Sequence, residues 1–383
     1  MFVHDSQLRH VLPPQAYYSE DQYRRELERA LLPGWHLVAS MGELRRDGDY
    51  VTLGLLGKPI LVRRIDGEAH AYLNVCGHRH CLLTSKPRGH DPSFRCQYHG
   101  WEYQCDGRTG RIPEAQSFRP FDRENARLVK FRAARCGDLV FVNLSEDGPS
   151  LREQMGETFE PIARAFSSPF RQVWDWSPEY PTNWKVAIEN LLESYHIPCL
   201  HEKTFGVMPP EEMIAHEMND RWTSFYTEDI HPWVRKGSGR TARALGLPFK
   251  GHYTQYHVYP NLVFILMDVV SLVKLVVPTS PTTSRAIVRV FTPFGPRRTP
   301  LAWISAWLNR LFAKEGARKI LEEDAAIFRD VQKGMEASTC PGVIGRREER
   351  VWAFQDWVLR KCGGETGGLS LPVIDGHANG AVR

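Results

Sequence analysis

Residues 76–113 constrain the fold most strongly, because this loop-like segment is rich in Cys, His, Gly and Arg and lies between segments with the pattern of short β-strands. Apolar and β-branched residues separated by turn residues such as Asp66-Gly67 are typical of a strand meander. These strands are predicted at residues 49–56, 59–65, 70–75 and 138–144. We therefore predict a small all-β domain over residues 41–145 that carries the loop.

The rest of the chain mixes helical and strand patterns. Ser19 begins a helical pattern that ends before Pro33-Gly34, and residues 1–40 are predicted to be an N-terminal helical segment that packs on the second domain. Residues 146–362 are predicted to form that second domain, of class α+β, and the glycine-rich residues 363–383 a flexible tail. Its helices are expected at 150–166, 183–197 and 315–337, and its strands within 253–293, with turns at 260–261 and 278–283.

Composition excludes several classes of protein. The chain has 383 residues, 42% hydrophobic side chains and a net charge of +4, which fits two or three globular domains and lacks the dense basic stripe of a nucleic-acid-binding protein. The N-terminus has no signal-peptide pattern, and charged or polar residues interrupt the most apolar stretch, 262–278, so we expect a cytoplasmic protein without a membrane partner. Its eight cysteines are expected to be reduced thiols or metal ligands.

Two Cys-His pairs stand in the loop: Cys76 with His78, and Cys96 with His99. Such pairs can supply two thiolates to one metal and two imidazoles to another, as in a Rieske [2Fe–2S] centre. A structural zinc site and a chance cluster are the alternatives. Zinc-finger spacings pair Cys with Cys and His with His, whereas each pair here is mixed.

These loops resemble those of the ring-hydroxylating oxygenase family, the terminal oxygenase components of Rieske non-haem iron systems, in the segments CGHRHC and CQYHGWEYQCDGRTGRIPEA. The resemblance implies that Cys76 and Cys96 bind one iron of the cluster, and that His78 and His99 bind the other. Gly100 is expected to lie where a larger side chain would not fit.

One position departs from the respiratory type of Rieske protein, in which two extra cysteines form a bridge. Cys81 occupies the first extra position, but Tyr98 occupies the second, so that bridge cannot form. We expect a cluster of the lower-potential oxygenase type. His80 stands where the family more often has Gly, and we expect it to be a solvated loop residue.

A second group of metal-ligand residues contains His196 and His201. They follow a helical pattern that begins at Asn183, and on one ideal helix they would point about 140° apart. Both can face one metal only if the backbone breaks between them, and Pro198 is predicted to make that break. Two imidazoles and a carboxylate are typical of non-haem Fe(II) oxygenases, although two histidines near a proline are also found as structural residues.

The segment NWKVAIENLLESYHIPCLHEKTFG resembles the family's iron-binding signature. The resemblance implies that His196 and His201 bind iron and that Glu193 links this site to the Rieske histidine of a neighbouring subunit. A predicted amphipathic helix at 319–337 resembles the family's late segment, which implies that Asp324 is the third ligand. Its competitors are Glu323, which is expected to face solvent about 100° around the helix, and Asp330.

The resemblance implies an α+β architecture, with an all-β Rieske [2Fe–2S] domain and a helix-grip catalytic domain built on an antiparallel sheet. It also implies a terminal oxygenase that uses O₂ to hydroxylate or oxidatively demethylate a small organic substrate, either an aromatic compound or a quaternary amine. Aromatic residues between 222 and 259 could form a cage for an ammonium group, although they are more often core.

No nucleotide-binding glycine motif follows a predicted strand, so electrons must come from NAD(P)H through a reductase, with or without a ferredoxin. The family resemblance implies a head-to-tail homotrimer, with or without a small β subunit. A Rieske electron carrier and a non-catalytic helix-grip ligand-binding protein are the alternative functions.

Overall fold

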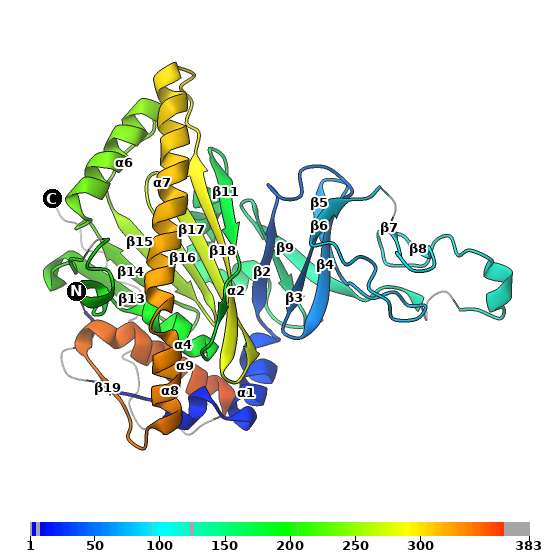
Figure 1. Ribbon diagram of the computed structural model, residues 1–383, viewed down its shortest axis with the longest axis horizontal. Helices are drawn as coiled ribbons and strands as arrows, with labels where there is room; N and C mark the ends of the chain where they lie inside the picture. The colour runs from blue at the N-terminus through cyan, green and yellow to red at the C-terminus, as the bar shows by residue number, and fades with distance from the viewer. Residues whose placement is uncertain (1, 5–7, 93, 123–125, 205, 364–383) are drawn as a thin grey trace.

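The computed structural model describes residues 2–4, 8–92, 94–122, 126–204 and 206–363, and apart from Gly363 the predicted tail lies outside these ranges. Two antiparallel sheets each form the centre of one domain (Figure 1). The seven-stranded sheet belongs to the smaller domain and the eight-stranded sheet to the larger one. The predicted α+β architecture is confirmed.

The smaller domain is a meander of short strands in the order β2-β10-β9-β5-β4-β3-β6. Its strands are β2 (Trp35–Ser40), β3 (Asp49–Leu55), β4 (Lys58–Ile65), β5 (Glu68–Leu73), β6 (Arg88–His90), β9 (Lys130–Cys136) and β10 (Leu139–Asn143). The predicted boundary at residue 41 was wrong, because β2 pairs with β10 and belongs to this sheet. The fully buried pattern of β2 has no alternation, which hid it from the sequence reasoning.

The N-terminal segment contains α1 (Glu20–Glu26) and the π-helical turn η2 (Leu27–Leu31), and it packs on the larger domain. The Ser19 side chain caps α1 by accepting a hydrogen bond from the Gln22 N–H. Glu26 is fully buried and forms an ion pair with Lys185 at 2.7 Å. Nearer the N-terminus, β1 (Leu8–Arg9) pairs with β19 (Val343–Ile344).

The larger domain is built on the strand order β11-β18-β17-β16-β15-β14-β13, with β12 beside β18. Its strands are β11 (Phe170–Trp176), β12 (Glu179–Tyr180), β13 (Ile214–Met218), β14 (Trp222–Thr227), β15 (Tyr253–Val258), β16 (Leu262–Leu266), β17 (Ser271–Ser280) and β18 (Thr283–Pro293). Its helices are α2 (Leu151–Met155), α3 (Phe159–Ala165), α4 (Trp184–Glu189), α5 (Ile197–Leu200), α6 (Pro232–Leu245), α7 (Pro300–Ala325), α8 (Phe328–Ala337) and α9 (Glu349–Cys362).

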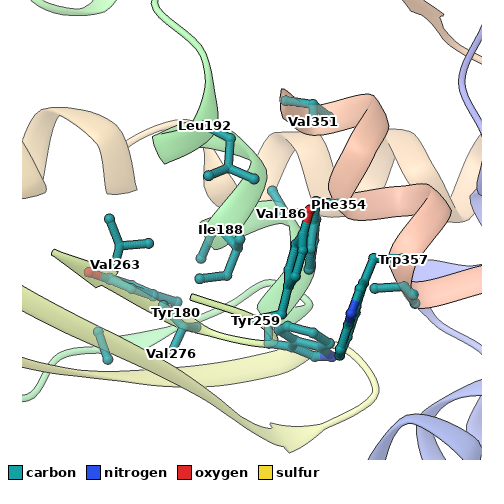
Figure 2. Packing of buried hydrophobic residues seen from close by; sticks show 14 of the residues in the cluster. Tyr180, Val186, Ile188, Leu192, Tyr259, Val263, Val276, Val351, Phe354 and Trp357 are labelled. Carbon is teal, nitrogen blue, oxygen red and sulfur yellow. The ribbon is translucent and has the colours of Figure 1, made fainter. Parts of the chain in front are cut away.

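One face of the larger sheet packs against α4, α7, α8 and α9. Alternation along β17 directs Val276 to this face, where it joins Val263 of β16 and Ile188 of α4 (Figure 2). Phe354 of α9 stacks against Tyr259, which closes the same core. This packing holds α4 and α7 over the sheet, which is where the second group of metal-ligand residues lies.

The opposite face of the larger sheet packs against the smaller domain. Leu37 of β2 and Phe141 of β10 share a core with Phe264 and Phe291 of the larger sheet. A buried ion pair at 2.7 Å also joins Arg289 of β18 to Glu43. The two domains are therefore joined by both apolar packing and a buried charge pair.

Candidate metal centres

The two Cys-His loops are held side by side by backbone hydrogen bonds. The first loop closes where the Cys76 N–H donates to the Cys81 carbonyl, and the second where the Cys96 N–H donates to the Trp101 carbonyl, each at 2.8 Å. The Gln97 N–H donates to the Leu83 carbonyl and ties the loops together. The two-stranded sheet of β7 (Phe94–Arg95) and β8 (Glu102–Tyr103) supports the second loop.

The four predicted cluster residues come together with the thiols inside and the imidazoles outside. Cys76 and Cys96 are buried, and burial raises the pKa of the Cys76 thiol. The rings of His78 and His99 lie 4.7 Å apart, and His99 is exposed. The pKa of His78 is lowered, mainly by burial and then by the charges of His99 and Arg79. A lower pKa favours the neutral imidazole that a metal requires.

Two aromatic residues fix this arrangement. Tyr103 places its hydroxyl 3.0 Å from the Cys76 sulfur and accepts a hydrogen bond from the Gly77 N–H at 2.9 Å. Trp101 is buried and stacks parallel to the His78 ring, with 4.7 Å between the ring centres. The sequence reasoning missed Tyr103, whose only signal was an aromatic residue shortly after the second Cys-His pair.

The glycine that cannot accept a side chain is Gly77, and the expectation for Gly100 was wrong in its cause. A Cβ on Gly77 would lie 2.4 Å from the carbonyl oxygen of Ala126, whereas a Cβ on Gly100 would meet nothing closer than 3.8 Å. Gly100 is instead required by its φ of +69°, a left-handed conformation that L side chains rarely adopt.

Cys81 and Tyr98 occupy the two positions that form the bridge in the respiratory type. Cys81 is a free thiol that donates to the Leu82 carbonyl at 3.2 Å, and Tyr98 is exposed. His80 is exposed, as expected, and its φ is +57°. This left-handed conformation explains why Gly is the more usual residue at that position.

The second centre brings His196, His201 and Asp324 together between α5 and the end of α7. One ligand atom from each lies within 4.8 Å of the others. The distance from Asp324 Oδ1 is 3.0 Å to His201 Nε2 and 3.5 Å to His196 Nε2. Asp324 and His201 are buried, so this group is shielded from bulk water.

Two further carboxylates hold the imidazoles from behind. Glu193 Oε1 contacts His196 Nδ1, and Glu323 Oε2 lies 2.8 Å from His201 Nδ1. Because a carboxylate only accepts, Nδ1 of each histidine carries a proton, and the two Nε2 atoms face Asp324 Oδ1. Burial lowers the pKa of His201, but hydrogen bonds to Asp324 and Glu323 outweigh it, so that pKa is raised.

The expectation that Glu323 faces solvent was therefore wrong, although Asp330 is exposed as a non-ligand would be. The helical-wheel argument assumed that only one side of α7 is covered. In the structure the chain after α5 also approaches α7, and the Thr204 hydroxyl donates to the same Glu323 oxygen at 2.8 Å. The predicted single helix at 319–337 is in fact divided between α7 and α8.

The backbone break near the histidines comes earlier than predicted. The helix from Asn183 ends within η6 (Asn190–Leu192), and Glu193 is extended. Pro198 does not end a helix but lies in the first turn of α5, where its missing N–H costs nothing. His196 and His201 flank this single turn, so a short helix brings both rings to one side.

Each centre contains a buried ligand atom positioned for a metal. In the part of the chain that the structure describes, His78 Nδ1 has no hydrogen-bond partner, and Asp324 Oδ1 faces the Nε2 atoms of His196 and His201. An unpaired buried polar atom is costly, and coordination to a metal would satisfy it. The two thiols with two imidazoles fit a [2Fe–2S] cluster, and the two imidazoles with one carboxylate fit Fe(II).

Comparison with protein families assigns both domains. The Rieske [2Fe-2S] domain matches residues 34–128, and the family described as the ring hydroxylating alpha subunit (catalytic domain) matches residues 169–364. The second match covers more than half of the chain. The chain belongs to the ring-hydroxylating alpha-subunit family.

Similar proteins in this family act on different substrates. The carnitine monooxygenase oxygenase subunit of Acinetobacter pittii (strain PHEA-2) is 29% identical over 56% of this chain and 58% of its own length. The chlorobenzene dioxygenase subunit alpha of Cupriavidus sp. (strain PS12) is 33% identical over 48% of this chain and 42% of its own. The chain thus spans about half the length of the curated relatives that it matches.

Solved structures share the fold over nearly the whole chain. A quaternary ammonium Rieske monooxygenase in complex with L-carnitine has a TM-score of 0.75 at 21% identity, over 92% of this chain and 95% of that one. Naphthalene 1,2-dioxygenase with indole bound has a TM-score of 0.71 at 18% identity, over 92% of each chain. At these identities the comparison supports the fold alone.

Several residues of this ring-hydroxylating signature hold the scaffold instead of a metal. Trp184 Nε1 and Lys185 Nζ both donate to the buried Glu26 carboxylate, at 2.8 and 2.7 Å. Glu189 accepts from the Tyr17 hydroxyl at 2.5 Å. The N-terminal segment is therefore fastened to the helix that precedes the candidate iron ligands.

The aromatic residues between 222 and 259 do not gather into one cage. Trp222 packs with the core shared by the two domains, Phe225 and Tyr253 form a separate cluster, and Tyr259 packs against α9. Trp233 is exposed on α6. The more ordinary reading of these residues as core agrees with the structure.

Proposed function

We propose that this chain is the terminal oxygenase component of a multicomponent Rieske oxygenase, which uses O₂ and external electrons to hydroxylate or oxidatively demethylate a small organic substrate. The observation that carries the proposal is the group of His196 with buried His201 and Asp324, in a chain that also has the Cys-His loops. A Rieske electron carrier would need only the smaller domain, and a ligand-binding protein would need neither centre.

Each centre has a distinct role in this proposal. Cys76 and Cys96 would hold one iron of the [2Fe–2S] cluster, and the other would be held by His78 and His99. The exposed edge of His99 supports electron entry at the histidine side, because the thiols are buried.

The mononuclear centre would be held by His196, His201 and Asp324. Fe(II) with three protein ligands keeps open positions where dioxygen can react beside an organic substrate. Glu193 and Glu323 keep the protons on Nδ1 of the two histidines, which leaves Nε2 directed at the metal position. Burial of His201 and Asp324 keeps bulk water away from the reacting atoms.

We further propose a head-to-tail homotrimer, in which Glu193 couples the mononuclear centre to the Rieske histidine of a neighbouring subunit. In one chain, β7 and β8 beside the cluster loops lie at the far end of the smaller domain, away from the end of α7 (Figure 1). Glu193 is held in place because its Oε2 accepts from the N–H of both Tyr195 and His196.

Electrons would come from NAD(P)H through a reductase, with or without a ferredoxin, and a small β subunit would be an optional partner. None of the eight cysteines, all of which lie in the described ranges, forms a disulfide, which supports a reducing compartment such as the cytoplasm. Candidate substrates are aromatic compounds and quaternary amines, the two classes that the names of similar proteins include.

The test is oxygen consumption that depends on substrate, measured with NADH and a surrogate reductase. The wild type is expected to couple it to product formation, and His196→Ala to retain the cluster's colour while losing turnover. In Glu193→Gln the reductase is expected to reduce the cluster normally, but little product should form. Undiminished turnover in His196→Ala would overturn the proposed iron site, and undiminished coupling in Glu193→Gln would overturn the bridging role.

A further inference from the structure

The first half of α7 exposes its large apolar residues and buries its small ones. Ala302, Ala306, Asn309 and Ala313 form the buried stripe. The exposed residues are Leu301, Trp303, Ile304, Trp307, Leu308, Leu311 and Phe312. At about 100° per residue they span about half of the helix circumference. A soluble helix normally shows the reverse pattern, so this face requires a partner that is itself apolar.

The same part of the molecule is basic. We define the α6–α7 face as residues 232–245 and 295–314, which contain no Asp or Glu. Their cations are Arg235, Lys236, Arg240, Arg243, Arg297, Arg298, Arg310 and Lys314. Five of them, Arg235, Lys236, Arg240, Arg243 and Arg297, line an open hollow of about 1100 Å³, which Glu228 and Asp229 also line.

Contrary to the expectation from the sequence that the protein has no membrane partner, we propose that the α6–α7 face binds the surface of an anionic lipid bilayer. An apolar arc rich in Trp and Leu with cations beside it is the pattern of helices that lie in the membrane interface. Trp303 and Trp307 are one turn apart and would sit at the level of the headgroups. No described helix has the length and hydropathy to cross a bilayer, so α7 would lie on the membrane and not span it.

Charge argues against two protein occupants of this face. A second copy docked through the same face would place like charges opposite each other. The Rieske domain of a neighbouring subunit also carries more Lys and Arg than Asp and Glu, so it is not complementary either. Figure 1 shows α6 and the start of α7 far from β7 and β8, so a donor that docks at the cluster leaves this face free.

The test is co-sedimentation of the full-length protein with vesicles of phosphatidylcholine alone or in equimolar mixture with phosphatidylglycerol. We expect binding to the mixed vesicles, and a loss on the order of ten-fold in affinity for the double variant Trp303→Ser/Trp307→Ser. Arg310→Gln/Lys314→Gln should weaken the dependence on phosphatidylglycerol. The matched control is Val129→Ser/Val343→Ser, which alters exposed apolar residues elsewhere.

Brominated acyl chains give a second readout, because they should quench the tryptophan fluorescence of the wild type more strongly than that of the double Trp variant. Wild-type protein that stays in solution with the mixed vesicles would overturn the proposal. Equal vesicle binding by the double Trp variant would do the same. If an acidic protein occupied the face instead, no vesicle binding would be seen.

A separate observation concerns the interior beside the mononuclear centre. Alternation along β17 directs Lys274 to the same face as Leu272 and Val276, which is the face covered by α4 and α7. Its Nζ lies 5.2 Å from the centre of the Tyr180 ring. Tyr180 is labelled beside Val276 and Val263 in Figure 2.

Two polar atoms in this apolar place have no partner. Among the described residues, neither Lys274 Nζ nor the Tyr180 hydroxyl forms a hydrogen bond, and both residues are at most 2% exposed. Burial lowers the pKa of Lys274 to about 8, and the charge of Asp324 opposes that shift. A buried cation without a hydrogen-bond partner is expensive, and a metal bound by Asp324 would neutralise the carboxylate charge that opposes the shift.

We infer that Lys274 and Tyr180 bind an anionic oxygen group, such as a carboxylate, on the substrate. This inference rests on the proposed oxygenase function. An ammonium and a phenol hydroxyl together offer the donors that a carboxylate accepts. The same ammonium disfavours a substrate that carries only positive charge, so an aromatic acid or a zwitterion fits better than a simple quaternary amine.

The test compares pairs of aromatic acids with their uncharged methyl esters in substrate-dependent O₂ consumption by the full enzyme system. The wild type should prefer an acid by a factor on the order of ten to a hundred in kcat/KM, and Lys274→Met should lose that preference mainly through KM. Lys274→Arg should restore part of it. An ester used as well as its acid would overturn this inference alone, whereas no O₂ consumption with any compound would overturn the proposed function.

Discussion

The cluster loops and the mononuclear centre use the chain in opposite ways. The four cluster residues lie between residues 76 and 99, and hydrogen bonds within and between their loops hold them. The mononuclear residues come from α5 and the end of α7, and the contact of His201 with Glu323 spans 122 positions. The first site is therefore a property of local sequence, and the second depends on how α7 packs over the sheet.

The two centres also differ in how deeply their residues are buried. At the cluster the sulfur side is buried and His99 is exposed, whereas His201 and Asp324 are both inside. Under the proposed function, the first centre would exchange electrons with a protein and needs an exposed edge, and the second would react with oxygen and needs to exclude water. The domain that carries each site provides that environment.

The largest expected effect comes from removing one ligand of the cluster, which should abolish the first centre and leave the second intact. Cys96→Ser removes a buried thiolate ligand, so the visible absorbance and the acid-labile sulfide should be lost and turnover should fall below detection. The mononuclear iron should remain, as measured by iron analysis. Cys105→Ser changes an exposed free thiol and should leave all three readouts unchanged. Turnover without a cluster would mean that the two centres do not work in series.

The next effect probes the carboxylate behind His201. Glu323→Gln keeps the shape but weakens the hold on the Nδ1 proton, and we expect a loss of about 10–100-fold in iron affinity or activity. Glu322→Gln is the matched control, because Glu322 pairs with Arg318 on the surface. Iron affinity is measured by competition with a chelator. Equal affinity in the two variants would show that Glu323 has no positioning role.

Backbone packing at the cluster is tested by two glycine variants. Gly77→Ala forces a clash with the Ala126 carbonyl and should destabilise the Rieske domain by about 1–3 kcal/mol, with lower cluster content. Gly100→Ala meets no close atom, and its left-handed conformation should cost only about 1–2 kcal/mol. Thermal unfolding and visible absorbance measure both. A greater cluster loss in Gly100→Ala would contradict this assignment of the tight glycine.

The smallest effect compares one buried histidine in each sheet. Burial lowers the pKa of His36 in β2 to about 4 and that of His257 in β15 to about 3. Both are neutral when folded but take up protons below about pH 6.5 when unfolded, so the free energy of unfolding should fall as the pH drops from there. Each contributes at most about 1.4 kcal/mol per pH unit.

His36→Gln and His257→Gln should each make that fall shallower between about pH 6.5 and 4, as denaturant titrations at several pH values would show. The slope is the readout, because both variants also alter packing. An unchanged slope in both would mean that these imidazoles are protonated in the folded protein.

The sequence predicted the local features well. The helix from Ser19 and four of the seven strands in the smaller sheet follow from spacing and alternation, which depend on near neighbours, and the four candidate cluster residues are close together in the sequence. It placed His196, His201 and Asp324 in one centre only through the resemblance to a family. The separation of those residues along the sequence does not determine how far apart they lie in space.

The errors arose where tertiary packing overrides local pattern. Glu323 seemed solvent-facing on a helical wheel, but the chain after α5 approaches it from that side. Pro198 was expected to end a helix and instead lies in the first turn of α5. The start of α7 at Thr299-Pro300 was missed, and with it the inverted apolar face. These errors have the same physical cause. In each case a segment that is distant in sequence packs against the residue and sets its environment.

The most direct test of two independent centres is the iron and sulfide content of the purified wild type and His201→Ala. Three irons and two sulfides per chain are predicted for the wild type, because a [2Fe–2S] cluster accounts for two of the irons. His201→Ala should keep the two sulfides and the cluster's colour but hold only two irons. Two irons in the wild type, or three in His201→Ala, would contradict a mononuclear centre at His196, His201 and Asp324.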